Sequence, residues 1–144
     1  MKKNGKHYES VLSLDQVNRL IDLGLEFPEE TLWSWQKEIQ SWSSNANDPS
    51  DYSLVLSDEI SIGGLTKYHR LPTLNSEELL DILPGSVQTC GIDYYMEIFR
   101  NMSDELTVRY MKNIMGEPLL VRSGKKLLDV CYEAIVALLE NDFL

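Results

Sequence analysis

Residues 123–144, SGKKLLDVCYEAIVALLENDFL, are the most strongly patterned part of this chain of 144 residues. Large and small apolar side chains recur there at the spacing of a single helix face, with acidic residues opposite, as in an amphipathic helix that covers a sheet. Ser123 is a suitable N-cap residue. The repeating apolar positions are Leu127, Cys131, Ala134, Ile135 and Leu138. We therefore predict a long C-terminal core helix.

Upstream of this helix the apolar period shortens from about four residues to two, which is the period of a strand. Residues 86–90 and 94–100 are predicted strands joined by a turn at 91–93. A turn at 101–104 leads to an alternating strand at 105–112, and within residues 114–122 a further short strand is predicted after Gly116 and Pro118. The pattern predicts an antiparallel meander with one covered face.

Two shorter helices carry capping boxes, in which side chain and backbone cap each other reciprocally. The first begins at Ser13, with Gln16 as its third residue, Leu12 and Val17 as a hydrophobic staple, and Gly24 as the left-handed residue that ends it. Its apolar stripe is predicted to comprise Leu14, Val17, Ile21 and either Leu20 or Leu25.

The second box begins at Asn75, with Glu78 as its third residue and with Leu74 and Leu79 as the staple. Pro84 and Gly85 then stop the helix. Its predicted apolar face consists of Leu79, Ile82 and Leu83.

Residues 31–42 contain three tryptophans and fit two structures. Pro28 and two glutamates before them suit a helix start, whereas the alternation at 32–35 suits a strand. Residues 43–53 are predicted as an exposed loop. Residues 52–62 then read as two short strands, and residues 65–74 continue in extended conformation.

Together these elements predict an α+β fold: an antiparallel sheet of three to five strands covered by two or three helices, including the long C-terminal one. The length fits a single domain over residues 1–144. Residues 1–7 are predicted to be a flexible tail.

The net charge of −10 disfavours binding to nucleic acid or to an anionic membrane through a broad face. The basic cluster at Lys2, Lys3 and Lys6 lies in the predicted tail. The longest apolar run is too short to span a membrane, and no signal-peptide pattern opens the chain. With only two cysteines, the sequence favours a cytoplasmic protein with free thiols.

The segments LPTLNSEELLDILPGSV and LLDVCYEAIVALLENDFL, separated by a strand pair, resemble a group of short acidic proteins. These proteins are encoded by gut bacteria, often on prophage-like or other mobile elements. The resemblance covers residues 71–144, and LSLDQVNRLIDLGLEFPEETLWSW resembles the N-terminal segment of the same group. It implies this fold and a mobile-element origin, and it carries over no catalytic residue.

The sequence offers little catalytic chemistry. It has two histidines, His7 and His69, and no CxxC or HxxxH spacing, so we predict no metal site and no cofactor. Cys131 lies on the apolar stripe, where we expect an inert core thiol. Cys90 precedes a turn, and its exposure is left open.

Large apolar side chains form a surplus over what one sheet face needs. If Tyr95 and Phe99 face away from Tyr94, Met96 and Ile98, both faces carry apolar bulk, which either the N-terminal half or a partner covers. Protein interfaces are rich in such residues. The candidate partner-binding residues are Trp33, Trp35, Tyr95, Phe99, Phe143 and Leu144.

Three functions follow as hypotheses. The first is a small cytoplasmic protein-binding or regulatory module that contacts a protein partner or forms a homodimer. The second is an acidic nucleic-acid mimic that inhibits a host DNA-binding protein, with its carboxylates gathered on one face. The third is an enzyme with Cys90 or His69 at a pocket, although no motif in the sequence argues for one.

Overall fold

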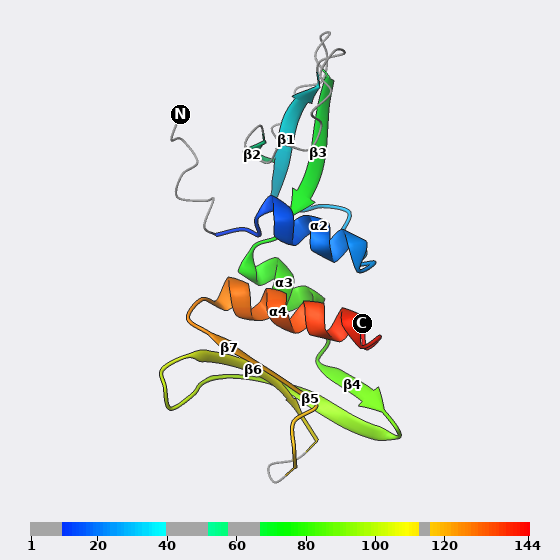
Figure 1. Ribbon diagram of the computed structural model, residues 1–144, viewed down its shortest axis with the longest axis vertical. Helices are drawn as coiled ribbons and strands as arrows, with labels where there is room; N and C mark the ends of the chain where they lie inside the picture. The colour runs from blue at the N-terminus through cyan, green and yellow to red at the C-terminus, as the bar shows by residue number, and fades with distance from the viewer. Residues whose placement is uncertain (1–9, 40–51, 58–66, 113–115) are drawn as a thin grey trace.

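The computed structural model describes residues 10–39, 52–57, 67–112 and 116–144. Within them, three helices lie across the middle of an elongated molecule, between a three-stranded sheet and a four-stranded sheet (Figure 1). The helices are α2 (Leu14–Asp22), α3 (Ser76–Ile82) and α4 (Leu127–Glu140). Both sheets are antiparallel, so the predicted α+β fold is confirmed, with a second sheet in addition.

The three-stranded sheet resolves the undecided tryptophan segment in favour of a strand. Its strands are β1 (Trp33–Ile39), β2 (Ser53–Leu56) and β3 (Lys67–Thr73), in the order β2-β1-β3. Trp33 and Trp35 both point to the buried face, where Trp35 lies opposite Leu54 and Leu71. On a helix, residues two apart would point about 200° from each other. The alternation therefore decides the conformation, because only a strand buries both indoles in one core.

Several sequence predictions concern residues outside the described ranges, in whole or in part. The predicted tail, residues 43–51 of the predicted loop and the expected strand at 60–62 lie outside them. At the end of that loop, Tyr52 is buried and β2 begins at Ser53, so an exposed loop extending to residue 53 is wrong there. Tyr52 is buried because it continues the inward alternation of Leu54.

The four-stranded sheet confirms the predicted meander. Its strands are β4 (Ser86–Thr89), β5 (Ile92–Arg100), β6 (Leu106–Met111) and β7 (Leu120–Gly124), paired in sequence order. The first turn is Cys90–Gly91, with φ of 52° and 74°, and not residues 91–93. Two positive φ values are what a two-residue type I′ hairpin requires, and its twist matches that of the strands.

Helix α4 starts later than predicted and is buried more completely. Ser123 belongs to β7, where its hydroxyl lies 2.9 Å from that of Thr107, and the N-cap is Lys126 without a side-chain cap. The strand pairing with β6 continues to Gly124 and so delays the helix. Because α4 lies between the sheet and α3, its burial extends beyond one stripe. Its buried residues are Leu128, Val130, Cys131, Tyr132, Ala134, Ile135, Val136, Ala137 and Leu138.

Both predicted capping boxes are present. In α2, Ser13 Oγ accepts a hydrogen bond from the Gln16 backbone amide at 3.2 Å, and Gln16 Oε1 accepts one from the Ser13 backbone amide at 2.9 Å. Gly24 has the expected positive φ, 91°. The stripe uses Leu20 as a buried position, whereas Ile21 is 41% exposed, which corrects the prediction for Ile21. The box of α3 is equally complete, with bonds of 2.8 and 2.9 Å between Asn75 and Glu78.

The backbone of Leu12 links the helices to the three-stranded sheet. Its carbonyl accepts from Trp35 Nε1 at 3.0 Å and from Thr73 Oγ1 at 2.8 Å, and its amide donates to the Leu74 carbonyl at 2.9 Å. Glu78 adds a further link, because its Oε2 accepts from the Leu32 amide just before β1. The segments that precede α2, α3 and β1 are thus held to one another.

Ile135 tests whether α4 is the core helix. It is fully buried, so Ile135→Asp introduces an unpaired charge at a cost of more than about 5 kcal/mol, comparable to the stability of a whole domain. We expect no cooperative transition in chemical denaturation followed by circular dichroism. Ile135→Val, the control, should lose only about 1 kcal/mol. A folded Asp variant would show that α4 is not core.

Candidate functional site

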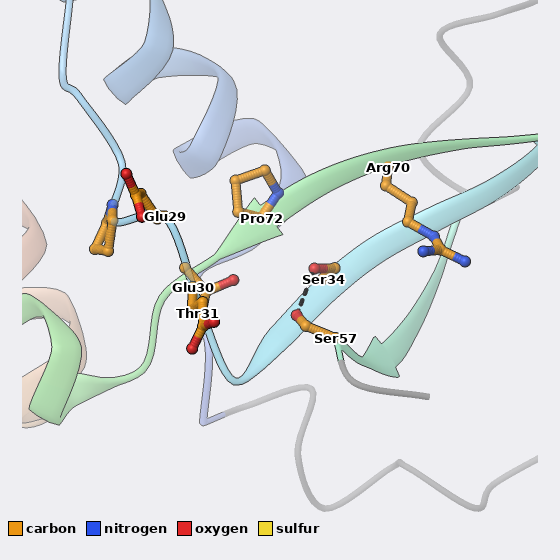
Figure 2. A pocket seen from close by; sticks show the side chains of 8 residues that line it. Glu29, Glu30, Thr31, Ser34, Ser57, Arg70 and Pro72 are labelled. Carbon is orange, nitrogen blue, oxygen red and sulfur yellow. Dashed lines mark hydrogen bonds between the residues drawn. The ribbon is translucent and has the colours of Figure 1, made fainter. Parts of the chain in front are cut away.

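A polar pocket lies on the outer face of the three-stranded sheet. It has a volume of about 500 Å³ and lies between the segment that leads into β1 and the strands themselves (Figure 2). Alternation in β1 and β3 turns Ser34 and Arg70 to this face, opposite the buried tryptophans. The lining residues are Pro28, Glu29, Glu30, Thr31, Ser34, Ser57, Arg70 and Pro72.

Charged groups of opposite sign stand at the two ends of this pocket. Figure 2 shows the side chains of Glu29 and Glu30 at one end, Arg70 at the other, and a serine pair between them. The hydroxyls of Ser34 and Ser57 are 2.7 Å apart. Arg70 Nε donates to Gln36 Oε1 at 2.7 Å, which fixes the guanidinium against the sheet. The arrangement suits polar groups of a ligand or partner.

The pocket does not assemble catalytic chemistry from its described residues. Neither histidine nor cysteine is among them, so they provide no Cys–His or Ser–His pair. His69 lies on the other face of β3, where its Nδ1 is 2.7 Å from the Tyr52 hydroxyl. Lys37 Nζ lies 5.9 Å from the centre of the Tyr52 ring. These three groups support one another at the end of the buried face.

The fold separates both thiols from His69, which belongs to β3 of the three-stranded sheet. Cys131 is fully buried in α4, and this burial raises the pKa of its thiol to about 11. This bears out the expected core role. Cys90 is exposed at the turn between β4 and β5, while β3 belongs to the other sheet (Figure 1). The fold therefore brings neither thiol to His69, and His7 lies outside the described residues.

The structure separates the six candidate partner-binding residues. Trp33 and Trp35 are core residues with 8% and 7% of their surface exposed. Phe143 is half-buried against the same core, and Leu144 beside it is 43% exposed. Tyr95 and Phe99 share the outer face of the four-stranded sheet. Burial thus leaves Tyr95 and Leu144 as the exposed members, whereas Phe99 is half-buried like Phe143.

The outer face of the four-stranded sheet is mixed in character. Tyr95 is 54% exposed, and the Arg109 guanidinium lies 4.6 Å from the centre of the Phe99 ring. Arg109 also forms two hydrogen bonds with Glu97 Oε2, at 2.8 and 2.9 Å. The opposite face packs Val108 and Tyr110 against α4. No described helix covers the outer face (Figure 1).

The acidic residues are concentrated in the middle of the molecule. We define the helical layer as the three helices with their flanking segments, residues 14–32, 75–85 and 125–144. These ranges contain 12 acidic and 3 basic residues, a net charge of −9 out of −10 for the chain. Residues 86–124, which form the four-stranded sheet, contain 5 acidic and 4 basic residues. Total charge alone did not reveal this separation, although a count over each predicted element would have.

Comparison with family models, with curated proteins and with solved structures found no match. Among the described helices, none has the length and apolar character needed to cross a membrane. The described residues also contain no group of three or more histidine, cysteine or carboxylate side chains placed to hold a metal ion.

The two thiols should differ sharply in reactivity. With a pKa of about 11, Cys131 is about one part in a thousand thiolate at pH 8, and it is also sheltered from solvent. We expect the native protein to consume one equivalent of Ellman's reagent, and Cys90→Ala to consume none until it is unfolded. Rapid reaction of the native Cys90→Ala variant would contradict the assignment of Cys131 to the core.

Proposed function

We propose that this protein is a cytoplasmic binding module that holds a basic protein partner through its helical layer. The observation that supports this is the net charge of −9 on that layer, against −1 on residues 86–124. A local concentration of negative charge of this kind steers a partner of opposite charge and repels polyanions. The exposed faces of α2, α3 and α4 are the contact surface.

The distribution of polar groups also favours binding over catalysis. The pocket of Figure 2 offers an arginine, hydroxyls and carboxylates, and its described residues supply no activated nucleophile. Cys131, the more shielded thiol, is a core residue. The outer face of the four-stranded sheet, with Tyr95 and Phe99, suits a second contact, including one with another copy of this chain.

A nucleic-acid mimic is the second candidate, favoured by the same separation of charge. Carboxylates concentrated on one layer carry the same negative charge as a phosphate backbone, so they can occupy a basic groove that otherwise binds nucleic acid. The resemblance to acidic proteins of mobile elements supports a host DNA-binding protein as the partner class. In that case duplex DNA and this protein compete for one groove.

The helical layer is tested by removing its charges. Asp22→Asn, Asp81→Asn and Glu133→Gln neutralise three exposed carboxylates of α2, α3 and α4. The matched control, Glu38→Gln, Asp93→Asn and Glu117→Gln, removes the same charge from exposed positions outside the layer. Partners are captured from a bacterial lysate and their affinities measured by calorimetry. We expect the layer variant to bind about tenfold more weakly or worse, because rim charges contribute up to about 1 kcal/mol each.

The outcomes separate the candidates. The protein is a nucleic-acid mimic if its partner meets three conditions. The partner binds the wild type and the control variant equally well, it no longer binds the layer variant, and duplex DNA displaces it. The same result without displacement identifies a binding module of another kind. Equal binding by both variants, or capture of no basic protein, would overturn the proposed function.

A further inference from the structure

The C-terminal ends of the three helices meet at a second pocket, of about 380 Å³. Gly24 and Leu25 follow α2, Ile82 is the last residue of α3, and Leu139 lies in the last turn of α4. Figure 1 shows the three helices running in the same direction, with these ends on one side. We name this site the end pocket; its described lining residues are Gly24, Leu25, Glu26, Ile82, Leu139 and Leu144.

The end pocket has an apolar floor and an apolar rim. Leu25, Ile82 and Leu139 are half-buried and pack on the core, so they are fixed in place. Leu144 is 43% exposed at the edge. Pockets that anchor a side chain of a partner combine a buried apolar floor with an exposed rim.

The electrostatics of the end pocket select for a cation. The C-terminal end of a helix carries a partial negative charge, which a basic residue in the last turn usually offsets. Neither α3 nor α4 has a basic residue in its last turn, and Arg19 of α2 pairs with Glu140 at 2.9 Å. Every charged residue within two positions of a lining residue is acidic, namely Asp22, Glu26, Asp81, Glu140 and Asp142.

We propose that the end pocket binds a basic amphipathic segment of a protein partner, with one large apolar side chain as its anchor. Lysine or arginine residues flanking the anchor would lie over the helix ends and the carboxylates around them. A second copy of this chain would bring acidic residues to an acidic site, so it does not fit. The inference rests on the proposed function and assigns the anchor point within the helical layer.

Three synthetic peptides test the end pocket against the whole, ¹⁵N-labelled protein by NMR. The first is an amphipathic helix of lysine and leucine, the second has serine in place of each leucine, and the third has glutamate in place of each lysine. We expect the first to shift the amide signals of Gly24, Leu25 and Leu139 and to bind at least about tenfold more tightly than the second, since burial of a leucine is favourable. The third should not bind.

Variants of the protein supply the control. Leu144→Ser removes the apolar rim, and Val121→Ser removes an apolar side chain of similar exposure, 38%, from the four-stranded sheet. Leu144→Ser should lower the affinity for the lysine–leucine peptide about fivefold or more, since it removes part of the apolar contact. Val121→Ser should leave this affinity unchanged. Equal binding of the serine peptide, shifts confined to other sites, or no binding would overturn the inference. If the peptides do not bind the end pocket but the charge-neutralised layer variant still loses its partner, only the inference about the end pocket is wrong, and the proposed function stands.

Discussion

The carbonyl oxygen of Leu12 is the point on which this architecture depends. It is buried and accepts two hydrogen bonds, one from the Trp35 indole of β1 and one from the Thr73 hydroxyl of β3, while the Leu12 amide pairs with Leu74 just before α3. A buried carbonyl left without donors costs about 1–3 kcal/mol, so these elements stabilise one another or separate together. These residues come from three segments that are remote in sequence, and the contact between them holds α2, α3 and the three-stranded sheet in one unit.

This constraint also determines the surface. With α2 fixed by Leu12 and α3 by the Asn75–Glu78 box, the helices run in one direction beside α4 and bring three C-terminal ends together. Parallel neighbours place like partial charges side by side, an arrangement that last-turn basic residues ordinarily relieve. Here α2 alone of the three has such a residue, Arg19, which pairs with Glu140, and acidic residues stand at all three ends. The layer therefore has a negative field that the fold itself does not neutralise, and a basic partner would relieve it.

Local rules in the sequence predicted much of the fold. The boxes at Ser13 and Asn75 depend on residues three apart, and the alternation of Leu106, Val108 and Tyr110 depends on neighbours, so both were readable. Ser123 has the residue type of an N-cap, but the structure places it in β7, because its role is set by pairing across to Thr107. Trp33 and Trp35 were assigned to a partner surface because only the fold shows that Leu54 and Leu71 enclose Trp35. Neither pocket was predictable, since each joins side chains from distant segments.

The most direct test of this account is native-state hydrogen exchange of the Leu12 amide, compared with the Ile135 amide in the core of α4. If Leu12 joins the three-stranded sheet and the helices into one cooperative unit, both amides should exchange with the free energy of global unfolding and respond equally to denaturant. Exchange of Leu12 at a distinctly lower free energy, with Ile135 still protected, would contradict the account. The three-stranded sheet would then open independently, and the chain would not unfold as a single domain.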